Sequence, residues 1–594
     1  MSLAIDRPRS RCLAGQASGG AAPIWHISAP SVVRKALLAG DRQAAWKAWQ
    51  KRLRNRRLPG IVAKQGALEG SLVWALTREQ VDGLSSIASG RGAAQREAVE
   101  RWLDGGDERG DRQTAALEAV AWCRALPDLA ATLPAGLWWR LWERLLEWAS
   151  DRTLDVRLLE EQPVAHQLLA GELALTLGYL FPELKPCRAV VKQARLMLSL
   201  GLEELLDGDG LLHARHFGAL RPLLACWTRC RALASRWKLG CWSAQAEKQF
   251  TQFVRQAVGL SRRDGGAVFS ALPGGKPDRQ MLRAALALVG APDDRTRASF
   301  VLADKSRGRT ATRKSMPRAA EHSEWAAVAV LRPDWKRSAP RLTVMNPGTE
   351  CHIELACGKD VLVSGAWQFE LTVDGVPATP TSDWSENCWV SDADIDYLEL
   401  EIELTHGLRL QRHLALARKE SIAFLSDTVL GSQRGGLQYR GTLPLYAGTT
   451  SKDARETREV VLCGGKPRAL VLPLQLPEWK DTRGHGEMLE LDGRLELRQG
   501  CQGTAMFAPL FLDLNPKRFD KRLTWRQLTV AETLEVVASD AAVGYRVQIG
   551  RKQWLLYRSL TTPRNRTVLG HNLSTEMLLA RFQSGEVEPL IEIE

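Results

Sequence analysis

Several features that mark common classes of protein are missing from this sequence. Nowhere do 18 apolar residues follow one another, which excludes a typical membrane-spanning helix. The eleven cysteines lie far apart and their number is odd, so we expect reduced thiols rather than a disulfide framework. There is no zinc-ligand spacing, no oxygen-rich calcium loop, no phosphate-binding glycine loop and no nucleophile elbow. The sequence therefore predicts no metal site and no cofactor.

Positive charge is in excess but is not concentrated in one segment. The chain has 81 Lys and Arg against 68 Asp and Glu, a formal net charge of +13. This balance favours an acidic partner. A nucleic-acid groove would show dense Lys and Arg with interleaved aromatic residues, and no such run appears. The charge is thus compatible with an anionic polysaccharide or oligosaccharide as the partner without by itself selecting one, while the absence of such a run argues against nucleic acid; no membrane partner is expected.

The first 23 residues carry charged side chains but no apolar segment of the kind found in a signal peptide. We therefore expect a cytoplasmic protein, unless the chain is secreted by another route or its true start differs. The oligomeric state is left open by the sequence.

The first half of the chain has the periodicity of amphipathic helices. Over 136–149, Leu and Trp fill one face while Arg and Glu fill the other, which places the Trp side chains in the core. Further helices are expected at 164–180, 187–206, 220–237, 244–260 and 279–289. Short connections between long helices predict antiparallel helical hairpins packed side by side.

After a basic segment at 304–322 the period of the apolar residues changes to two. Over 396–404, Leu and Ile alternate with Glu, which predicts a strand with one buried face and one solvated face. Similar strands are expected at 367–373, 408–416, 460–463, 469–476 and 545–549, with a short helix at 574–582. Asp492-Gly493 between two apolar runs indicates a hairpin. The fold class is thus multi-domain α + β: a helical domain at 1–303, a linker at 304–322 and a large antiparallel β-sandwich at 323–594.

Several short motifs resemble, in order and rough spacing, those of the heparinase II/III-like polysaccharide lyases. In the helical half these are His166-Gln167, the segment 180–183 and Asp209-Gly210; in the second half they are 326–335, 356–363 and 410–427. The resemblance covers about 150–430. It implies an incomplete α/α toroid of helical hairpins followed by the β-sandwich, and β-elimination at uronic acids of an anionic polysaccharide.

That reaction needs a group that neutralises the uronate carboxylate, a base for the C5 proton and an acid for the leaving oxygen. The resemblance assigns the amide of Gln167 to the carboxylate, supported by His166. The segment His213–His216 supplies two imidazoles that suit a base, with Arg215 as a carboxylate clamp. Further candidates for substrate binding are Arg221, His322 and Arg412. Each has a structural alternative: a helix end, a solvated loop or, for Arg412, an ion pair on the inward face of a strand.

The sequence also departs from the family at its catalytic positions. Ala219-Leu220 stands where a Tyr-His pair is expected, and Asn346-Pro347-Gly348 stands near the expected His-Ala-Asp. Two hypotheses follow: a divergent lyase, or a catalytically inactive relative that binds acidic glycans or serves as a scaffold. A third is a hydrolase with Glu172 and Asp209 as its acid and base.

Overall fold

The computed structural model describes residues 24–56, 58–59, 92–105, 111–151, 154–238, 240–271, 274, 276–289, 292–302, 318–336, 338–484, 486–583 and 585–594. The chain forms two compact units. The α-helical unit comprises Met1–Leu212, His216–Val258 and Gly275–Asp294, and the β unit comprises His213–Arg215, Gly259–Gly274 and Arg295–Glu594. Most of the predicted linker at 304–322 lies outside the described residues, and its last two residues already belong to the first strand.

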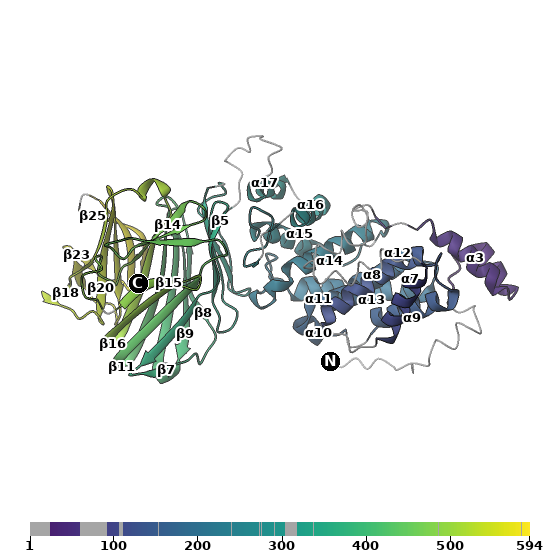
Figure 1. Cartoon of the computed structure of the whole chain (residues 1–594), viewed down its shortest axis with the longest axis horizontal. Coiled ribbons are helices and arrows are strands. Elements are labelled where there is room, and N and C mark those ends of the chain that lie inside the picture. The colour runs from purple at the N-terminus through teal and green to yellow at the C-terminus, as the bar shows by residue number, and fades with distance from the viewer. Residues whose placement is uncertain are drawn as a thin grey trace. The chain divides into compact units, whose positions relative to one another are not determined.

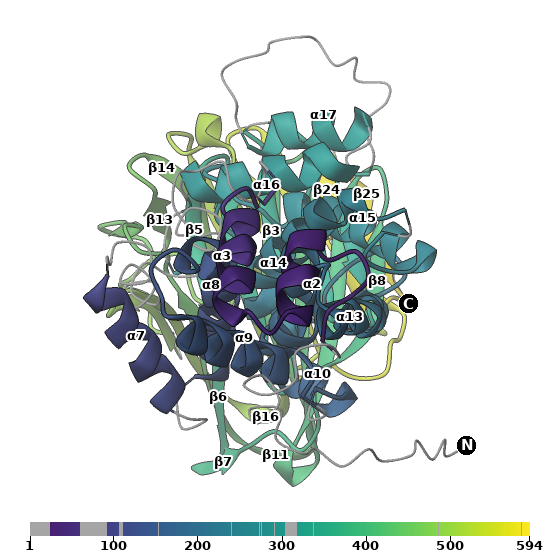
Figure 2. The ribbon, with the colours of Figure 1, turned by 90° about the vertical axis from the view of Figure 1, so that its right-hand side faces the viewer.

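Antiparallel helices build the α-helical unit, as the amphipathic periodicity predicts (Figure 1). In chain order they are α2 (Ser31–Leu38), α3 (Arg42–Leu53), α7 (Ala93–Asp104), α8 (Arg112–Leu129), α9 (Ala135–Ala149), α10 (Val156–Glu161), α11 (Pro163–His166), α12 (Ala174–Leu180), α13 (Lys185–Glu204), α14 (Leu220–Leu233), α15 (Ala244–Gly259) and α16 (Lys276–Val289). A ten-residue helix, α17 (Pro292–Val301), follows them. Figure 2 shows α2 and α3 packed as a hairpin.

The helix predicted at 164–180 is interrupted by a wider turn. Between α11 and α12 the backbone forms a π-helical segment, Gln167–Leu173, in which every residue is buried. Such segments have i→i+5 hydrogen bonds and occur mostly as a single wide turn inside an α-helix. Here the segment directs two polar side chains, Gln167 and Glu172, into the interior of the unit.

Tryptophans on α9 pack as predicted. Trp138 and Trp142 are buried, and Trp138 and Trp139 meet edge to face with ring centroids 4.9 Å apart. Edge-to-face geometry is a favoured arrangement for aromatic rings in a core. No helix among the described residues is long and apolar enough to cross a membrane.

The described residues of the β unit form four antiparallel sheets. The first has the order β1-β2-β3-β4-β5. Its strands are β1 (Glu321–Ser323), β2 (Val328–Leu331), β3 (Pro340–Met345), β4 (His352–Cys357) and β5 (Asp360–Ala366). The second, of 11 strands, has the order β12-β13-β14-β16-β11-β10-β9-β8, with β15 on β16 and β6-β7 on β11. Its strands are β6 (Gln368–Val373), β7 (Val376–Ala378), β8 (Ser385–Ser391), β9 (Ile395–Leu404), β10 (Leu408–Ala417), β11 (Ile422–Pro444), β12 (Thr450–Asp453), β13 (Val460–Cys463), β14 (Pro467–Pro473), β15 (Gly486–Leu491) and β16 (Arg494–Asp513).

The remaining strands form two smaller sheets. One has the order β17-β20-β21-β24-β25 and contains β17 (Leu523–Leu528), β20 (Ala542–Ile549), β21 (Lys552–Ser559), β24 (Met577–Gln583) and β25 (Glu586–Ile593). The other, β19-β18-β22-β23, contains β18 (Val530–Glu532), β19 (Glu535–Val536), β22 (Arg566–Val568) and β23 (His571–Leu573).

The large sheet is covered on both faces. One core lies between it and the sheet β1–β5, and a second lies between its opposite face and the sheet that contains β20 and β21. Two predictions are wrong, each because of contacts with distant strands. The Glu face of β9 is not fully solvated, because Tyr397 and Glu399 are buried in that second layer. The segment predicted as a helix at 574–582 forms β24, because pairing with β21 and β25 outweighs the helix propensity of its Met, Leu and Ala residues.

The predicted hairpin at Asp492-Gly493 is confirmed. Leu491 pairs with Arg494, and both turn residues have positive φ, 51° and 71°. This is the geometry of a type I′ turn, which Asp-Gly favours.

Candidate functional site

The amide of Gln167 lies wholly in the interior of the α-helical unit. Its Nε2 donates to the carbonyl of Met197 at 2.9 Å and lies 3.0 Å from Nδ1 of His166. Its Oε1 accepts from the indole N–H of Trp227 at 2.8 Å. Both donors and the acceptor of the amide are therefore engaged, and no part of the residue is exposed. A glycan carboxylate would reach this amide only if these contacts opened.

His166, the neighbour of Gln167, is equally buried. Burial disfavours the charged imidazolium and lowers the pKa of His166 to about 4. The ring is therefore neutral at physiological pH. The structure thus brings these two predicted site residues together, in the packed interior of the unit.

Glu172, the acid of the hydrolase hypothesis, forms a buried ion triad. Its carboxylate accepts from Arg124 at 2.6 Å and from two nitrogens of Arg229 at 2.7 and 2.8 Å. Burial alone would favour the neutral acid, but the two guanidinium groups hold the pKa of Glu172 below its usual value. A carboxylate held ionised in this way does not suit a general acid. Asp209, in contrast, is exposed.

Residues 213–216 form a compact turn, and the 3-10 helix Ala214–Ala219 begins within it. The backbone N–H of Arg215 donates to Nδ1 of His213 at 3.2 Å, while the side chain of Arg215 is exposed. Burial and the charge of Arg215 lower the pKa of His213. The ring of His213 packs edge to face on Trp325, and the amide of Ala214 donates to the carbonyl of Ala326. His216 follows in the same turn, and Arg221 lies in the first turn of α14.

His322 lies on β1 of the β unit, where a loop was expected. Its Nε2 pairs with Glu386 on β8 at 2.7 Å. Its ring stacks on Trp389 with centroids 4.5 Å apart and planes 8° from parallel. The imidazole is thus fixed by a hydrogen bond to Glu386 on one side and an aromatic ring on the other.

Arg412, on β10, is fully buried and forms the ion pair expected as its structural alternative. Nε and Nη2 each donate to Asp427 at 2.8 Å, and Nη1 donates to the carbonyl of Trp367. The indole of Trp367 stacks on the guanidinium at 3.9 Å. Tyr439 donates a further hydrogen bond to Asp427. Arg412 contacts a ligand only if this network opens.

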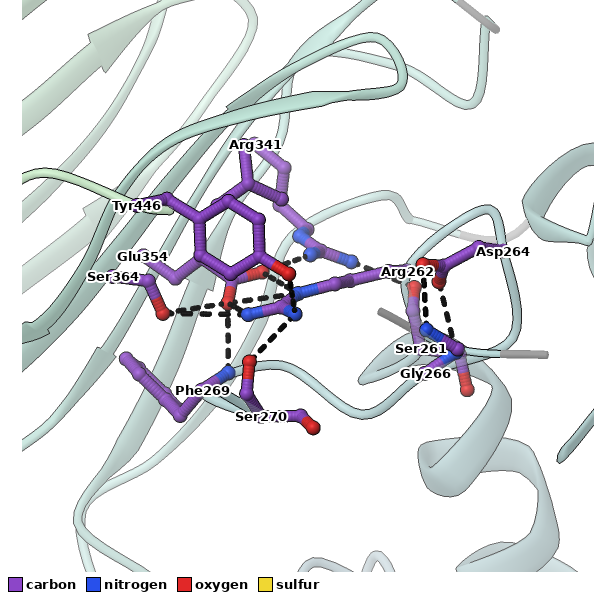
Figure 3. Close-up of polar contacts among 12 residues, drawn as sticks. Ser261, Arg262, Asp264, Gly266, Phe269, Ser270, Arg341, Glu354, Ser364 and Tyr446 are labelled. Atoms are coloured by element: carbon purple, nitrogen blue, oxygen red, sulfur yellow. Dashed lines mark hydrogen bonds and ion pairs between the residues drawn. The ribbon is translucent and has the colours of Figure 1, made fainter. Parts of the chain in front are cut away.

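Sequence reasoning missed a buried charged cluster of the β unit, which is centred on Glu354 in β4 (Figure 3). The carboxylate accepts from Arg262 at 2.6 Å, from Arg341 at 2.8 Å and from the backbone N–H of Phe269 at 2.7 Å. Tyr446 covers the guanidinium of Arg262 at 4.6 Å. The one signal in the sequence is a lone carboxylate within the apolar strand 352–357, which requires a cation once it is buried.

Beside this cluster a pocket opens in the surface of the β unit. It lies at the start of β3 and the turn between β4 and β5, the opposite end of these strands from Asn346. The described residues of its lining are mainly basic, with one acid, Asp334, against Arg262, Arg263, Arg332, Lys336, Arg341 and Lys359.

Metal binding finds no support in the described part of the chain, where no three His, Cys, Asp or Glu side chains gather to hold an ion. Cys226 and Cys230, one turn apart on α14, are fully buried, and burial raises the pKa of both thiols. Protonated buried thiols are poor ligands and behave as small apolar residues.

Comparison with solved structures finds this fold among the heparinases. Heparinase III matches with a TM-score of 0.59 over 90% of this chain and 99% of its own, at 10% identity. The heparan sulfate lyase HepC of Pedobacter heparinus matches with a TM-score of 0.56 over 90% and 98%, at 13% identity. No protein-family model matches the sequence, and a search of curated proteins found no similar sequence. The chain therefore has the fold of the heparinase-like polysaccharide lyases, a helical α/α toroid followed by an antiparallel β-sandwich, which confirms the predicted fold class.

Proposed function

We propose that this protein is a catalytically inactive relative of the lyases that binds anionic polysaccharide. The observation that carries the proposal is the burial of Gln167. A group that neutralises a uronate must meet the substrate, and this amide instead bonds to Met197, His166 and Trp227. Ala219-Leu220 and Asn346-Pro347-Gly348, at the other catalytic positions, carry no acid or base.

Two properties support an anionic glycan as the ligand. The fold is that of proteins whose names describe them as heparan sulfate lyase and heparinase. The net charge of +13 attracts polyanions by a long-range force that salt screens. Loss of the catalytic groups does not remove either property.

A second candidate is a divergent lyase that works through the turn at 213–216. In neutral His213, Nδ1 accepts from the backbone N–H of Arg215, so Nε2 carries the proton and can donate a hydrogen bond to a glycan oxygen. The adjoining Arg215 is exposed and suits a carboxylate clamp, and His216 lies in the same turn as a base. This arrangement places a hydrogen-bond donor, a carboxylate clamp and a candidate base within four residues.

One experiment separates the two candidates. The purified full chain is mixed with heparan sulfate, chondroitin sulfate and neutral dextran, and both binding and absorbance near 232 nm are followed. The proposal predicts salt-sensitive binding to the acidic glycans, none to dextran, and no rise in absorbance. A rise that is lost in His216→Ala and kept in Gln167→Ala would establish the lyase. Absence of binding to every acidic glycan would refute both candidates.

A further inference from the structure

The basic pocket beside Glu354 has more buried positive charge than its carboxylates neutralise. Glu354 is shared between Arg262 and Arg341. Asp334, the one acid among the described lining residues, pairs with Lys336. None of the carboxylates that the structure describes in the lining is left for Arg332.

Arg332 is the residue on which the inference rests. Its side chain is buried, with 6% of the residue exposed. Nη2 donates to the carbonyl of Gly259 at 2.8 Å, and the guanidinium stacks on Trp335 at 4.3 Å. Neither partner carries a negative charge, and no ion pair joins Arg332 to a carboxylate of the described residues.

The nearby carboxylates are committed to other cations. Glu321 pairs with Arg297 at 2.9 Å. Asp396 accepts the backbone N–H of Arg332, but its ion pair is with Arg418. An unpaired buried guanidinium is costly, and an anion in the pocket would offset that cost.

The pocket also has room for a small anion. Its volume of about 60 Å³ exceeds the roughly 10–15 Å³ that one water molecule needs, so it admits a group larger than a single water. Arginine side chains suit an oxyanion because their N–H donors match pairs of its oxygens.

We propose that this pocket is a binding site for a tetrahedral oxyanion, a phosphate or sulfate group, held by Arg332 and Arg341 with the exposed Lys359 at the rim. The ligand is either a free ion or an ester group on a larger molecule, and both present the same oxygens. The site does not depend on the proposed glycan function, because it uses none of Gln167, His213, Arg215 or His216.

Titration of the full chain with inorganic phosphate and inorganic sulfate tests the proposal. Calorimetry at constant ionic strength, set with chloride, should show one saturable site. Arg332→Met should weaken binding at least about tenfold, because it removes a charge-assisted contact. Arg409→Met is the matched control, since Arg409 is an exposed, singly paired arginine of the same unit, and it should bind as the parent does.

Two further measurements keep the proposal falsifiable. Lys359→Ala, an exposed change with little effect on folding, should weaken binding several-fold even if Arg332→Met fails to fold. A sulfated polysaccharide that displaces sulfate, while its desulfated form does not, would identify the ester source; failure of both to compete would identify the free ion. No saturable binding, or equal affinity in Lys359→Ala and the parent together with equal affinity in any folded Arg332→Met, would overturn the proposal. Glycan binding elsewhere on the chain would be unaffected by either outcome.

Discussion

Replacing Glu354 by Gln tests whether the charge at the centre of the arginine cluster holds the β unit together. The substitution keeps the shape of the side chain but removes the negative charge. Arg262 and Arg341 would then lie buried without an anion, and the new NH₂ group would face guanidinium donors instead of accepting from them.

The size of the expected destabilisation follows from the burial of the Glu354 carboxylate. Glu354 is 0% exposed and accepts hydrogen bonds from two guanidinium groups, the N–H of Phe269 and the hydroxyl of Ser364. Removing one partner from a buried ion network costs about 3–5 kcal/mol. We expect Glu354→Gln to lower the free energy of unfolding of the β unit by that amount.

Urea denaturation followed by far-ultraviolet circular dichroism measures this change. The matched control is Glu588→Gln, because Glu588 is 69% exposed and pairs with Arg581 at 2.6 Å. Exposed pairs contribute about 0–1 kcal/mol, so this variant should unfold almost as the parent does. If the free energy of unfolding of Glu354→Gln lies within about 1 kcal/mol of that of Glu588→Gln, the argument is refuted.

A double variant gives a sharper test of the same argument. Arg332 and Arg341 repel each other, which is one cause of the low pKa of Arg332, about 9, after burial itself. Removing Arg332 lowers the positive charge that Glu354 balances. The cost of Glu354→Gln should therefore be smaller in an Arg332→Met background, and strict additivity would contradict the coupling.

Three further predictions concern the interior of the α-helical unit. Gln167→Ala should cost about 2–4 kcal/mol in thermal denaturation, since it leaves a cavity and the unpaired N–H of Trp227, and it should leave glycan binding unchanged. Gly201→Ala should cost about 1–3 kcal/mol, because its Cβ would lie 2.3 Å from the amide of Gln167, whereas Gly136→Ala, with open space around it, should not destabilise. His166 takes up a proton near pH 6.5 in the unfolded state but only near pH 4 in the native state. The contribution of neutral His166 to the free energy of unfolding is therefore fully present above pH 6.5, and it falls by at most about 3 kcal/mol as the pH drops to 4. Denaturation midpoints of the parent should therefore fall more steeply over this range than those of His166→Asn, and parallel pH profiles would contradict the assignment.

Much of the fold was predictable because the local periodicity of apolar residues determines the type of each helix or strand. The apolar stripe of α9, the alternation along β9 and the Asp492-Gly493 turn each fix the conformation of a few neighbouring residues. The order of the short motifs was enough to indicate the lyase-like fold, which the structural comparison confirms.

Tertiary packing decided what local pattern cannot express. The segment 577–583 has good helix formers, yet it is a strand because two strands pair with it. Glu399 was expected in solvent, yet a second sheet covers it. In both cases the deciding contacts come from residues distant in the chain. The pattern of apolar and polar residues within the segment therefore cannot predict them.

For the candidate sites, too, some properties follow from the sequence and others only from the tertiary structure. The sequence by itself determined which residue types are present: an amide beside a histidine at Gln167, two histidines around Arg215, and scattered arginines. Only the tertiary structure decided that Gln167 points into the core and that Arg262, 92 positions from Glu354, shares a carboxylate with Arg341. The physical reason is that burial and charge pairing depend on distances between side chains, and folding sets those distances without regard to separation along the chain.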